Sequence, residues 1–169
     1  MTTFAVLATG QSMSLELARR VMGRCNVVAV SDAFRLAPWA DAMASQDASW
    51  WRHNPDAKAF EGQKFCGAQD VEGVTRLEGI SSETNSGLLA LHVAVKLGAT
   101  RVLLLGFDMQ GTHYFGPHKE PLKNTKPHRF EVFQAQFARF QPRGVEIINC
   151  TAGSALRAYP MGDLACALG

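Results

Sequence analysis

The sequence predicts one α/β domain over residues 1–169: a Rossmann-like, doubly wound, mostly parallel sheet with helices on both faces. Three observations predict this fold. Units of a strand followed by a helix succeed one another along the chain, which favours parallel strands joined by crossover connections. The apolar runs are too short for core helices and are stopped by glycine or polar residues, as buried strands are. Polar residues follow the end of one run after another, and ligands bind at that edge of such sheets.

The composition narrows the class of protein. Hydrophobic residues make up 47% and charged residues 19% of the chain, which is typical of a globular protein and argues against disorder. The net charge of +2 does not by itself imply nucleic-acid binding. No apolar run has the length of a membrane span, and Met1–Thr3 lacks the basic start of a signal peptide, so we expect a cytoplasmic protein. The 4 cysteines are scattered, which favours reduced thiols over disulfides or a zinc site.

The first strand is expected at Phe4–Ala8, and apolar residues at helical spacing follow over Leu15–Met22. Between them, the turn of Gly10, Gln11 and Ser12 would present free N–H groups and the start of a helix to an anion the size of phosphate. A plain strand-to-helix turn is an equally good interpretation. The turn has one glycine and no Gly-Lys-Ser/Thr, so it is neither a dinucleotide fingerprint nor a P-loop.

Acidic residues follow the next two predicted strands. Asp32 comes just after the strand Asn26–Val30, where an acid binds a ribose hydroxyl in doubly wound sheets, although it can also cap the next turn. Asp47 follows a weaker strand at Ala40–Ser45. The pair Trp50–Trp51 beside it either forms a wall of a binding pocket or packs a short helix on the sheet.

The stretch Asn54–Ser82 carries a weaker signal, because glycines divide it into short pieces. Short strands are expected at Lys64–Cys66 and Val74–Leu77. We expect this part of the chain to be irregular and partly antiparallel.

The centre of the chain combines a polar turn, a helix and the most hydrophobic strand. The turn Glu83–Gly87 opens an apolar helix at Leu88–Leu97, and the buried strand Val102–Leu105 follows. Asp108 lies just beyond the end of that strand. A polar loop, a helix, a buried strand and an acid at the strand's carboxyl end are the parts of a nucleotide site in an open α/β sheet.

A long polar loop, Met109–Lys126, follows the central strand. Loops of this length inside a compact domain are usually functional or mobile. Its basic segment, residues 118–129, has two interpretations: contact with phosphate or a nucleic-acid backbone, or a solvated charged loop. The histidines of this region lack metal-ligand spacing and a nearby carboxylate cluster, so no metal site is expected.

The C-terminal part completes the sheet. Four phenylalanines repeat at helical spacing and are expected to form core rather than a binding surface. They are Phe130, Phe133, Phe137 and Phe140. The last strand is expected at Val145–Ile148 and a closing helical segment at Leu156–Leu168. Asn149 and Ser154 lie past the end of the last strand, as polar residues do after the earlier strands.

The polar residues that follow the strands are expected to converge. The carboxyl ends of parallel strands share one edge of the sheet, so these residues form the wall of a single nucleotide-sized cleft. The predicted nucleotide-binding residues are Gly10, Gln11, Ser12, Asp32, Asp47, Asn85, Ser86, Gly87, Asn149 and Ser154.

Four stretches of the chain resemble, in the same order, the bacterial sialyltransferases of glycosyltransferase family 42. They are Ala8–Ser14, Asn85–Gly87 with its helix, Leu104–Asp108 and Ile148–Ser154. The same stretches are similar to the archaeal 6-hydroxymethylpterin pyrophosphokinase-like family, the flagellin motility-associated factors and uncharacterised bacteriophage proteins. The resemblance spans nearly the whole chain. In the case of a phage protein, the expected cytoplasm is that of the bacterial host.

The resemblance implies roles for individual residues. In the sialyltransferases the first glycine-containing turn and the Ser-Gly turn bind the cytidine nucleotide of the donor, and Asp32 stands where that family has a nucleotide-binding asparagine. Their catalytic histidine precedes a tyrosine in a polar loop after the central strand. His113 and Tyr114 match that pair, with Asp108 at the strand end, so these three are the predicted catalytic residues. A neutral His113 would take a proton from the acceptor hydroxyl. The implied ligand is a nucleotide or nucleotide-sugar donor, CMP-linked, with no cofactor required.

The chain departs from the sialyltransferases at a position that matters for catalysis. Those enzymes carry a tyrosine two residues beyond the strand-end aspartate, where it assists the leaving phosphate, and this chain has Gln110 there. The chain is also shorter and has little room for a lid over the donor sugar. It contains no Asp-x-Asp pair to bridge a metal and a diphosphate, and the family resembled is itself metal-independent.

Three functions are compatible with the sequence. The first is a metal-independent transferase that uses a nucleotide-activated donor, similar to a small glycosyltransferase. The second is a Mg²⁺-dependent pyrophosphokinase-like enzyme, with Asp47 and Asp108 as candidate ligands. The third is a non-catalytic nucleotide-binding or phage accessory protein that retains the fold. The sequence does not identify the acceptor, and it is compatible with a homo-oligomer.

Overall fold

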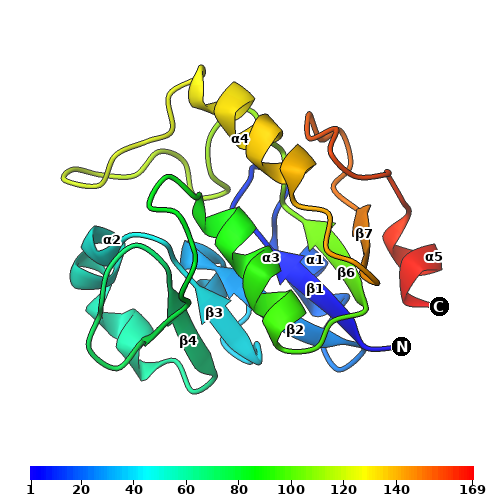
Figure 1. The fold of residues 1–169 in the computed structure, drawn as a ribbon, viewed down its shortest axis with the longest axis horizontal. Coiled ribbons are helices and arrows are strands. Elements are labelled where there is room, and N and C mark those ends of the chain that lie inside the picture. The colour runs from blue at the N-terminus through cyan, green and yellow to red at the C-terminus, as the bar shows by residue number, and fades with distance from the viewer.

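Seven parallel strands form one sheet in the computed structural model, which describes residues 1–169 (Figure 1). In chain order they are β1 (Thr3–Leu7), β2 (Asn26–Val30), β3 (Ala42–Ala44), β4 (Gln63–Cys66), β5 (Thr75–Arg76), β6 (Arg101–Leu105) and β7 (Glu146–Asn149). Their order across the sheet is β5-β4-β3-β2-β1-β6-β7. The chain therefore builds outward from β1 to β5, returns to the other side of β1 for β6, and ends at β7. This confirms the predicted doubly wound α/β fold.

Helices connect the strands and cover both faces of the sheet. The α-helices are α1 (Leu15–Arg19), α2 (Ala48–His53), α3 (Ser86–Lys96), α4 (Arg129–Arg139) and α5 (Leu164–Leu168). Two 3₁₀ helices are η1 (Ser31–Arg35) and η2 (Pro55–Ala59). Figure 1 shows α3 and α4 in front of the sheet and α1 behind it. None of these helices combines the length and the apolar character that a membrane span requires.

Two hydrophobic cores lie on opposite faces of the sheet, because successive strand residues point to opposite sides. Val6 of β1 lies beside Val28 of β2 and Leu104 of β6, and all three are buried in the core beneath α3 and α4. Their neighbours in the strands, such as Leu7 and Leu105, face the core that includes the tryptophans of α2. Strands buried on both faces explain why the apolar runs in the sequence are nearly continuous.

The chain reverses its direction of winding beside β1. The connection from β2 leads away on one side, and α3 carries the chain back to β6 on the other. The edges of β1 and β6 stay paired beyond the strands, since Ala8 N donates to Leu105 O over 2.8 Å and Gly10 N donates to Gly106 O over 2.9 Å. The crevice at this switch point is where doubly wound sheets bind ligands.

Two details of the fold differ from the prediction. The strands of region 54–82 are parallel, because β4 pairs with β3 and β5 pairs with β4 in that direction, and its antiparallel part is confined to an isolated bridge between Val71 and Val74. The connection through α2 and η2 brings the chain back to the starting edge before β4 begins. The closing helix covers only Leu164–Leu168. The chain before it runs beside β7, where Asn149 N donates to Pro160 O over 2.8 Å, and this pairing holds it in an irregular conformation.

Candidate functional site

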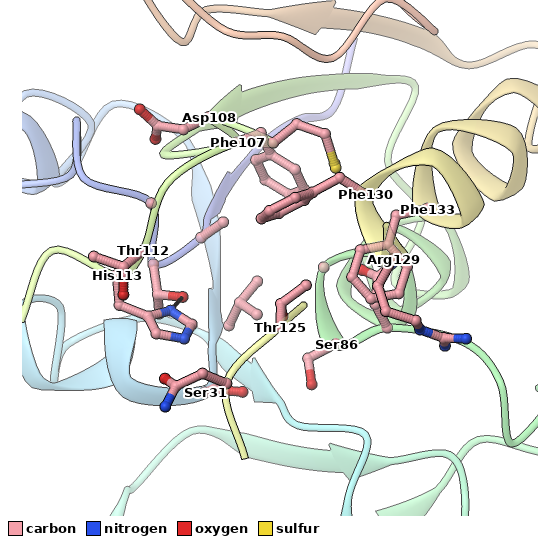
Figure 2. Close-up of a pocket in the computed structure, with 18 of the residues that line it drawn as sticks. Ser31, Ser86, Phe107, Asp108, Thr112, His113, Thr125, Arg129, Phe130 and Phe133 are labelled. Atoms are coloured by element: carbon pink, nitrogen blue, oxygen red, sulfur yellow. Dashed lines mark hydrogen bonds between the residues drawn. The ribbon is translucent and has the colours of Figure 1, made fainter. Parts of the chain in front are cut away.

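A cavity of about 540 Å³ lies at the carboxyl ends of β1, β2, β3 and β6. The starts of α3 and α4 and the long loop between β6 and α4 complete its wall. Figure 2 shows labelled residues from the ends of β2 and β6, the long loop and the starts of α3 and α4 around one space, with His113 on one side and Phe133 on the other. Of the predicted site residues, those that line the cavity are Gly10, Asp32, Asp47, Asn85, Ser86, Gly87, Asp108 and His113. Those that do not line it are Gln11, Ser12, Tyr114, Asn149 and Ser154.

The start of α3 presents unpaired backbone donors to the cavity. Asn85 is the N-cap residue, and its Oδ1 accepts from Leu88 N over 2.9 Å. The N–H groups of Ser86 and Gly87 donate to no acceptor within the chain, and both residues line the cavity. Ser86 Oγ accepts from Gln46 N over 2.9 Å, which fixes the start of α3 to the end of β3. The first turn of an 11-residue helix therefore faces the cavity with free donors and a positive dipole end.

The turn before α1 is filled by the protein itself. Ser12 donates to the Asp108 carboxylate twice, from Oγ over 2.7 Å and from its backbone N over 3.2 Å. A methyl group at Gly10 would overlap both that carboxylate and the Gly106 carbonyl, so glycine is needed for their approach. Gln11 is exposed and lies against Gly111. The donors of Ser12 therefore already have an anionic partner, which favours the interpretation of this stretch as a plain turn.

Asp32 and Asp47 both line the cavity but differ in their availability. The Asp32 carboxylate accepts from Trp50 Nε1 over 2.9 Å and from Arg35 Nε over 3.1 Å, so its two oxygens have protein partners. Asp47 makes no cap hydrogen bond to α2 and is exposed to the cavity. Partial desolvation by the surrounding protein raises the pKa of its carboxyl. Asp47 is therefore the acid that a ligand can reach.

His113 is held at the cavity by contacts with the end of β1. Its Nδ1 lies 2.8 Å from Thr9 Oγ1, and its backbone forms an isolated antiparallel bridge with Gly10. Tyr114 N donates to Thr9 O over 2.8 Å, and Tyr114 Oη donates to Asp32 O over 2.8 Å. Tyr114 therefore anchors the loop to two strand ends, while His113 alone of the pair faces the cavity (Figure 2).

The His113 imidazole is neutral at physiological pH. Burial, and secondarily the neighbouring His118, lower the pKa of His113 to about 4, and Asp32 opposes this shift. In the tautomer that carries the proton on Nδ1, the ring donates to Thr9 and Nε2 keeps its lone pair for a ligand. No carboxylate is bonded to Nδ1, so the ring lacks the orienting acid of a catalytic triad.

Asn149 and Ser154 lie beneath the site and brace it. Both are buried, and Asn149 Nδ2 donates to Ser154 Oγ over 3.0 Å. Ser154 Oγ in turn donates to Phe107 O, and Thr151 Oγ1 accepts from Phe107 N over 3.0 Å. This network holds the backbone of Phe107 at the end of β6. The loop after β7 therefore positions the cavity wall without contacting the cavity.

The cavity has an aromatic wall built partly from residues predicted to be core. Phe107, Phe130 and Phe133 line the cavity, and Figure 2 shows them together on the side of α4. The prediction that the phenylalanine stripe is core and not a binding surface is right in part: Phe137 is buried and Phe133 packs against the core, yet both line the cavity together with the half-buried Phe130. Phe130 and Phe133 lie in the first two turns of α4, which starts over the carboxyl edge of the sheet. Their place at the start of this helix is the feature of the sequence that could have indicated a role in the cavity wall.

Cationic side chains of the loop and of α4 also reach the cavity. Arg129 pairs with Glu83 at 3.6 Å and stacks on Phe133, with its guanidinium carbon 5.4 Å from the ring centroid. Lys123 and His118 line the cavity as well. The basic segment predicted at 118–129 therefore divides into residues that face the cavity and residues, such as Lys126, that do not.

Two residues in the cavity wall have a left-handed backbone. Ser31, at the end of β2, has φ 44°, and Met109, after β6, has φ 55°. Residues other than glycine rarely adopt this conformation, and each such residue costs roughly 1–2 kcal/mol. The surrounding contacts hold both in place, since Ser31 Oγ lies 2.8 Å from Ser45 Oγ.

No group of three or more His, Cys, Asp and Glu side chains is placed to hold a metal ion. No protein-family model matches the chain, and no curated protein matches it. The resemblance to sialyltransferases and pyrophosphokinase-like proteins therefore stays a prediction. The cavity itself is the feature of the molecule that bears on function.

Proposed function

We propose that the cavity binds a nucleotide and that the protein is a metal-independent transferase with a nucleotide-activated donor. One observation carries the nucleotide proposal: the unpaired N–H groups of Ser86 and Gly87 and the aromatic wall share one cavity at the switch point of the sheet. Helix-start donors bind acceptor oxygens, and aromatic rings stack with a base. A volume of about 540 Å³ is within the range of small-ligand sites.

The cavity offers a partner for each part of a nucleotide. The rings of Phe107, Phe130 and Phe133 provide an apolar surface for the base. Asp47 provides an accessible acceptor for ribose hydroxyls or an exocyclic amine. The acid predicted for the ribose, Asp32, instead acts through Trp50 and Arg35 to fix the wall.

His113 is the proposed proton acceptor of the transfer. The acceptor hydroxyl would lose its proton to His113 Nε2 as its oxygen bonds to the transferred group. The bond from that group to the phosphate oxygen breaks, and the nucleotide leaves with the electron pair. Asp108 contributes by holding the turn through Ser12, and Tyr114 by anchoring the loop. The resemblance to the sialyltransferases supports this assignment of His113.

A second candidate function is a nucleotide-binding protein without catalysis. The state of His113 favours it, since a base with a pKa of about 4 is weak at neutral pH. Gln110 favours it too, because its amide donates to Gly153 O over 3.1 Å and it replaces a tyrosine that the resembled enzymes use.

A thermal-shift screen with CMP, UDP, GDP and ATP, each with and without Mg²⁺, tests the proposal. A nucleotide at about 100 times its Kd raises stability by about 2.7 kcal/mol, and we expect this without metal. Metal-dependent stabilisation by ATP alone would favour a pyrophosphokinase-like enzyme instead. The variant Gly87→Ala places a methyl group 3.0 Å from a Phe107 ring carbon, and we expect it to reduce the shift.

Turnover separates the two candidates. A transferase is expected to release free nucleotide from a nucleotide-sugar donor, which chromatography measures. The variant His113→Ala is expected to lose this release and to keep the thermal shift. Binding without release in the wild-type protein would support the non-catalytic function. No shift with any nucleotide would contradict both.

A further inference from the structure

We infer that His118 and Lys123 form a phosphate subsite on the loop side of the cavity, and that this subsite, not the start of α3, holds the nucleotide's phosphate. The identity of the ligand as a nucleotide rests on the proposed function. The subsite itself is a claim about a tetrahedral dianion, so inorganic phosphate tests it independently.

The loop folds back on itself to place both residues at the cavity. His118 N donates to Asn124 Oδ1 over 2.7 Å, and Asn124 Nδ2 donates to His118 O over 3.1 Å. Between them, Leu122 N donates to Lys119 O over 3.1 Å and closes a turn. Lys123 directly precedes Asn124 in this small closed loop, and both Lys123 and His118 line the cavity.

The donors of this wall have no partner in the protein. The His118 ring makes no hydrogen bond, Lys123 makes no hydrogen bond or ion pair, and His113 uses only Nδ1. The His113 and His118 ring centroids are 4.5 Å apart, and Phe115 stacks on His113 with centroids 4.8 Å apart. An ammonium group and an imidazole edge, both open to one cavity, suit an anion with several acceptor oxygens.

Charge favours this wall over the start of α3. Glu83 and Asp47 both line the cavity on the α3 side, and the cation there, Arg129, already pairs with Glu83. A phosphate dianion at α3 would therefore meet the unpaired carboxylate of Asp47 and no free cation. The acid nearest the histidines, Asp32, is paired with Arg35 at 3.1 Å. The N–H groups of α3 remain available for neutral acceptors of the base or sugar.

Proton uptake is expected to accompany phosphate binding. Two imidazoles this close do not both carry charge, and burial lowers the pKa of His118 in the free protein, with Asp32 opposing that shift. The titratable and charged groups around the ring are His113 and Asp32 with its Arg35 partner, and Lys123 lines the same cavity. A bound dianion favours the imidazolium of His118 and so raises its pKa. The positive charge on His118 keeps His113 neutral, which preserves His113 as a proton acceptor.

Binding titrations by calorimetry test the subsite with cytidine, CMP and the diester cytidylyl-cytidine. The variants are His118→Asn and Lys123→Met, and the control is Lys126→Met, which changes an exposed lysine of the same loop outside the cavity. In the wild type at pH 6.5 we expect CMP to bind at least about tenfold more tightly than cytidine. We expect that ratio to fall to about threefold or less in both variants and to stay unchanged in the control.

The pH dependence gives a second measurement. Between pH 6.5 and 8.5 we expect wild-type affinity for CMP to fall about tenfold as His118 loses its proton, and the affinity of His118→Asn to stay nearly constant. Inorganic phosphate is expected to raise the His118 pKa measured by NMR of the imidazole nitrogens.

Different outcomes distinguish failure of the subsite from failure of the nucleotide proposal. If His118→Asn still binds CMP more tightly than cytidine while Gly87→Ala binds both equally, the subsite is overturned and the phosphate lies at α3. If cytidine and CMP do not bind but inorganic phosphate raises the pKa of His118, the phosphate subsite is supported and the cytidine nucleotide is excluded as its ligand. Equal affinity for cytidylyl-cytidine, lost in His118→Asn, would overturn the monoester assignment in favour of a nucleic-acid backbone.

Discussion

Two turns lead into helices at the carboxyl edge of the sheet, and they differ in what occupies their donors. At Gly10–Ser12 the backbone N–H and hydroxyl of Ser12 donate to Asp108, a carboxylate from a distant part of the chain. At Asn85–Gly87 the N–H groups of Ser86 and Gly87 have no partner and line the cavity. An anion-binding turn can thus be satisfied by the protein's own acid, and the turn without such an acid is the one open to a ligand.

The largest effect is expected at the filled turn, from Gly10→Ala. The added methyl group overlaps the Asp108 carboxylate and the Gly106 carbonyl, so the turn must open or the strand end must move. We expect the free energy of unfolding to fall by about 3 kcal/mol, measured by urea denaturation. Gly153→Ala is the control, because Gly153 has φ 70° but open space around it and should lose only about 1 kcal/mol. Equal losses would show that Asp108 does not fill the turn tightly.

Asp108→Asn tests whether the charge of the filling acid matters. The amide keeps the shape but weakens two hydrogen bonds from Ser12 that a carboxylate strengthens. We expect a loss of about 2 kcal/mol in the free energy of unfolding, with nucleotide affinity changed less than about threefold. A large loss of affinity with unchanged stability would instead mean that Asp108 contacts the ligand.

Ser86→Ala perturbs the open turn. Its hydroxyl accepts from Gln46 N, and without it that buried donor is unpaired, which costs about 1.5 kcal/mol of stability. The start of α3 also loses its fixed position, so we expect nucleotide affinity to fall about tenfold by calorimetry. The matched control is Ser81→Ala, whose hydroxyl accepts from Glu83 N outside the cavity and should leave affinity unchanged.

Ser12→Ala is the smallest change and completes the comparison. It removes the hydroxyl bond to Asp108 but leaves the backbone bond. We expect a stability loss of about 1 kcal/mol in urea denaturation and unchanged nucleotide affinity. If Ser12→Ala weakened binding as much as Ser86→Ala, the two turns would both contact the ligand, and the contrast between them would be wrong.

Local pattern was sufficient for the central strands of the sheet. The strands at Asn26–Val30 and Arg101–Leu105 are apolar runs that end at a polar residue or glycine, and their parallel order follows from the alternation with helices. The same alternation predicts that Asp32, Asp47 and Asp108 meet at one edge of the sheet, and all three line the cavity there.

The unpredicted features depend on contacts between distant residues. The Gly10 turn looks open in the sequence because its occupant, Asp108, lies 96 positions beyond Ser12. Phe130 and Phe133 share the spacing of Phe137, and all three line the cavity because α4 begins over it, although only Phe137 is fully buried in the core. Asn149 carries the same polar character as Asp47, but it pairs with Ser154 beneath the site.

The left-handed backbones of Ser31 and Met109 have a consequence for engineering. Glycine at either position would relieve about 1 kcal/mol of strain, so a screen for thermostability is expected to select these positions. Each substitution would also remove a side chain from the cavity wall, where Ser31 meets Ser45 and Met109 packs against the core. Variants that become more heat-resistant here are therefore expected to bind the proposed nucleotide more weakly.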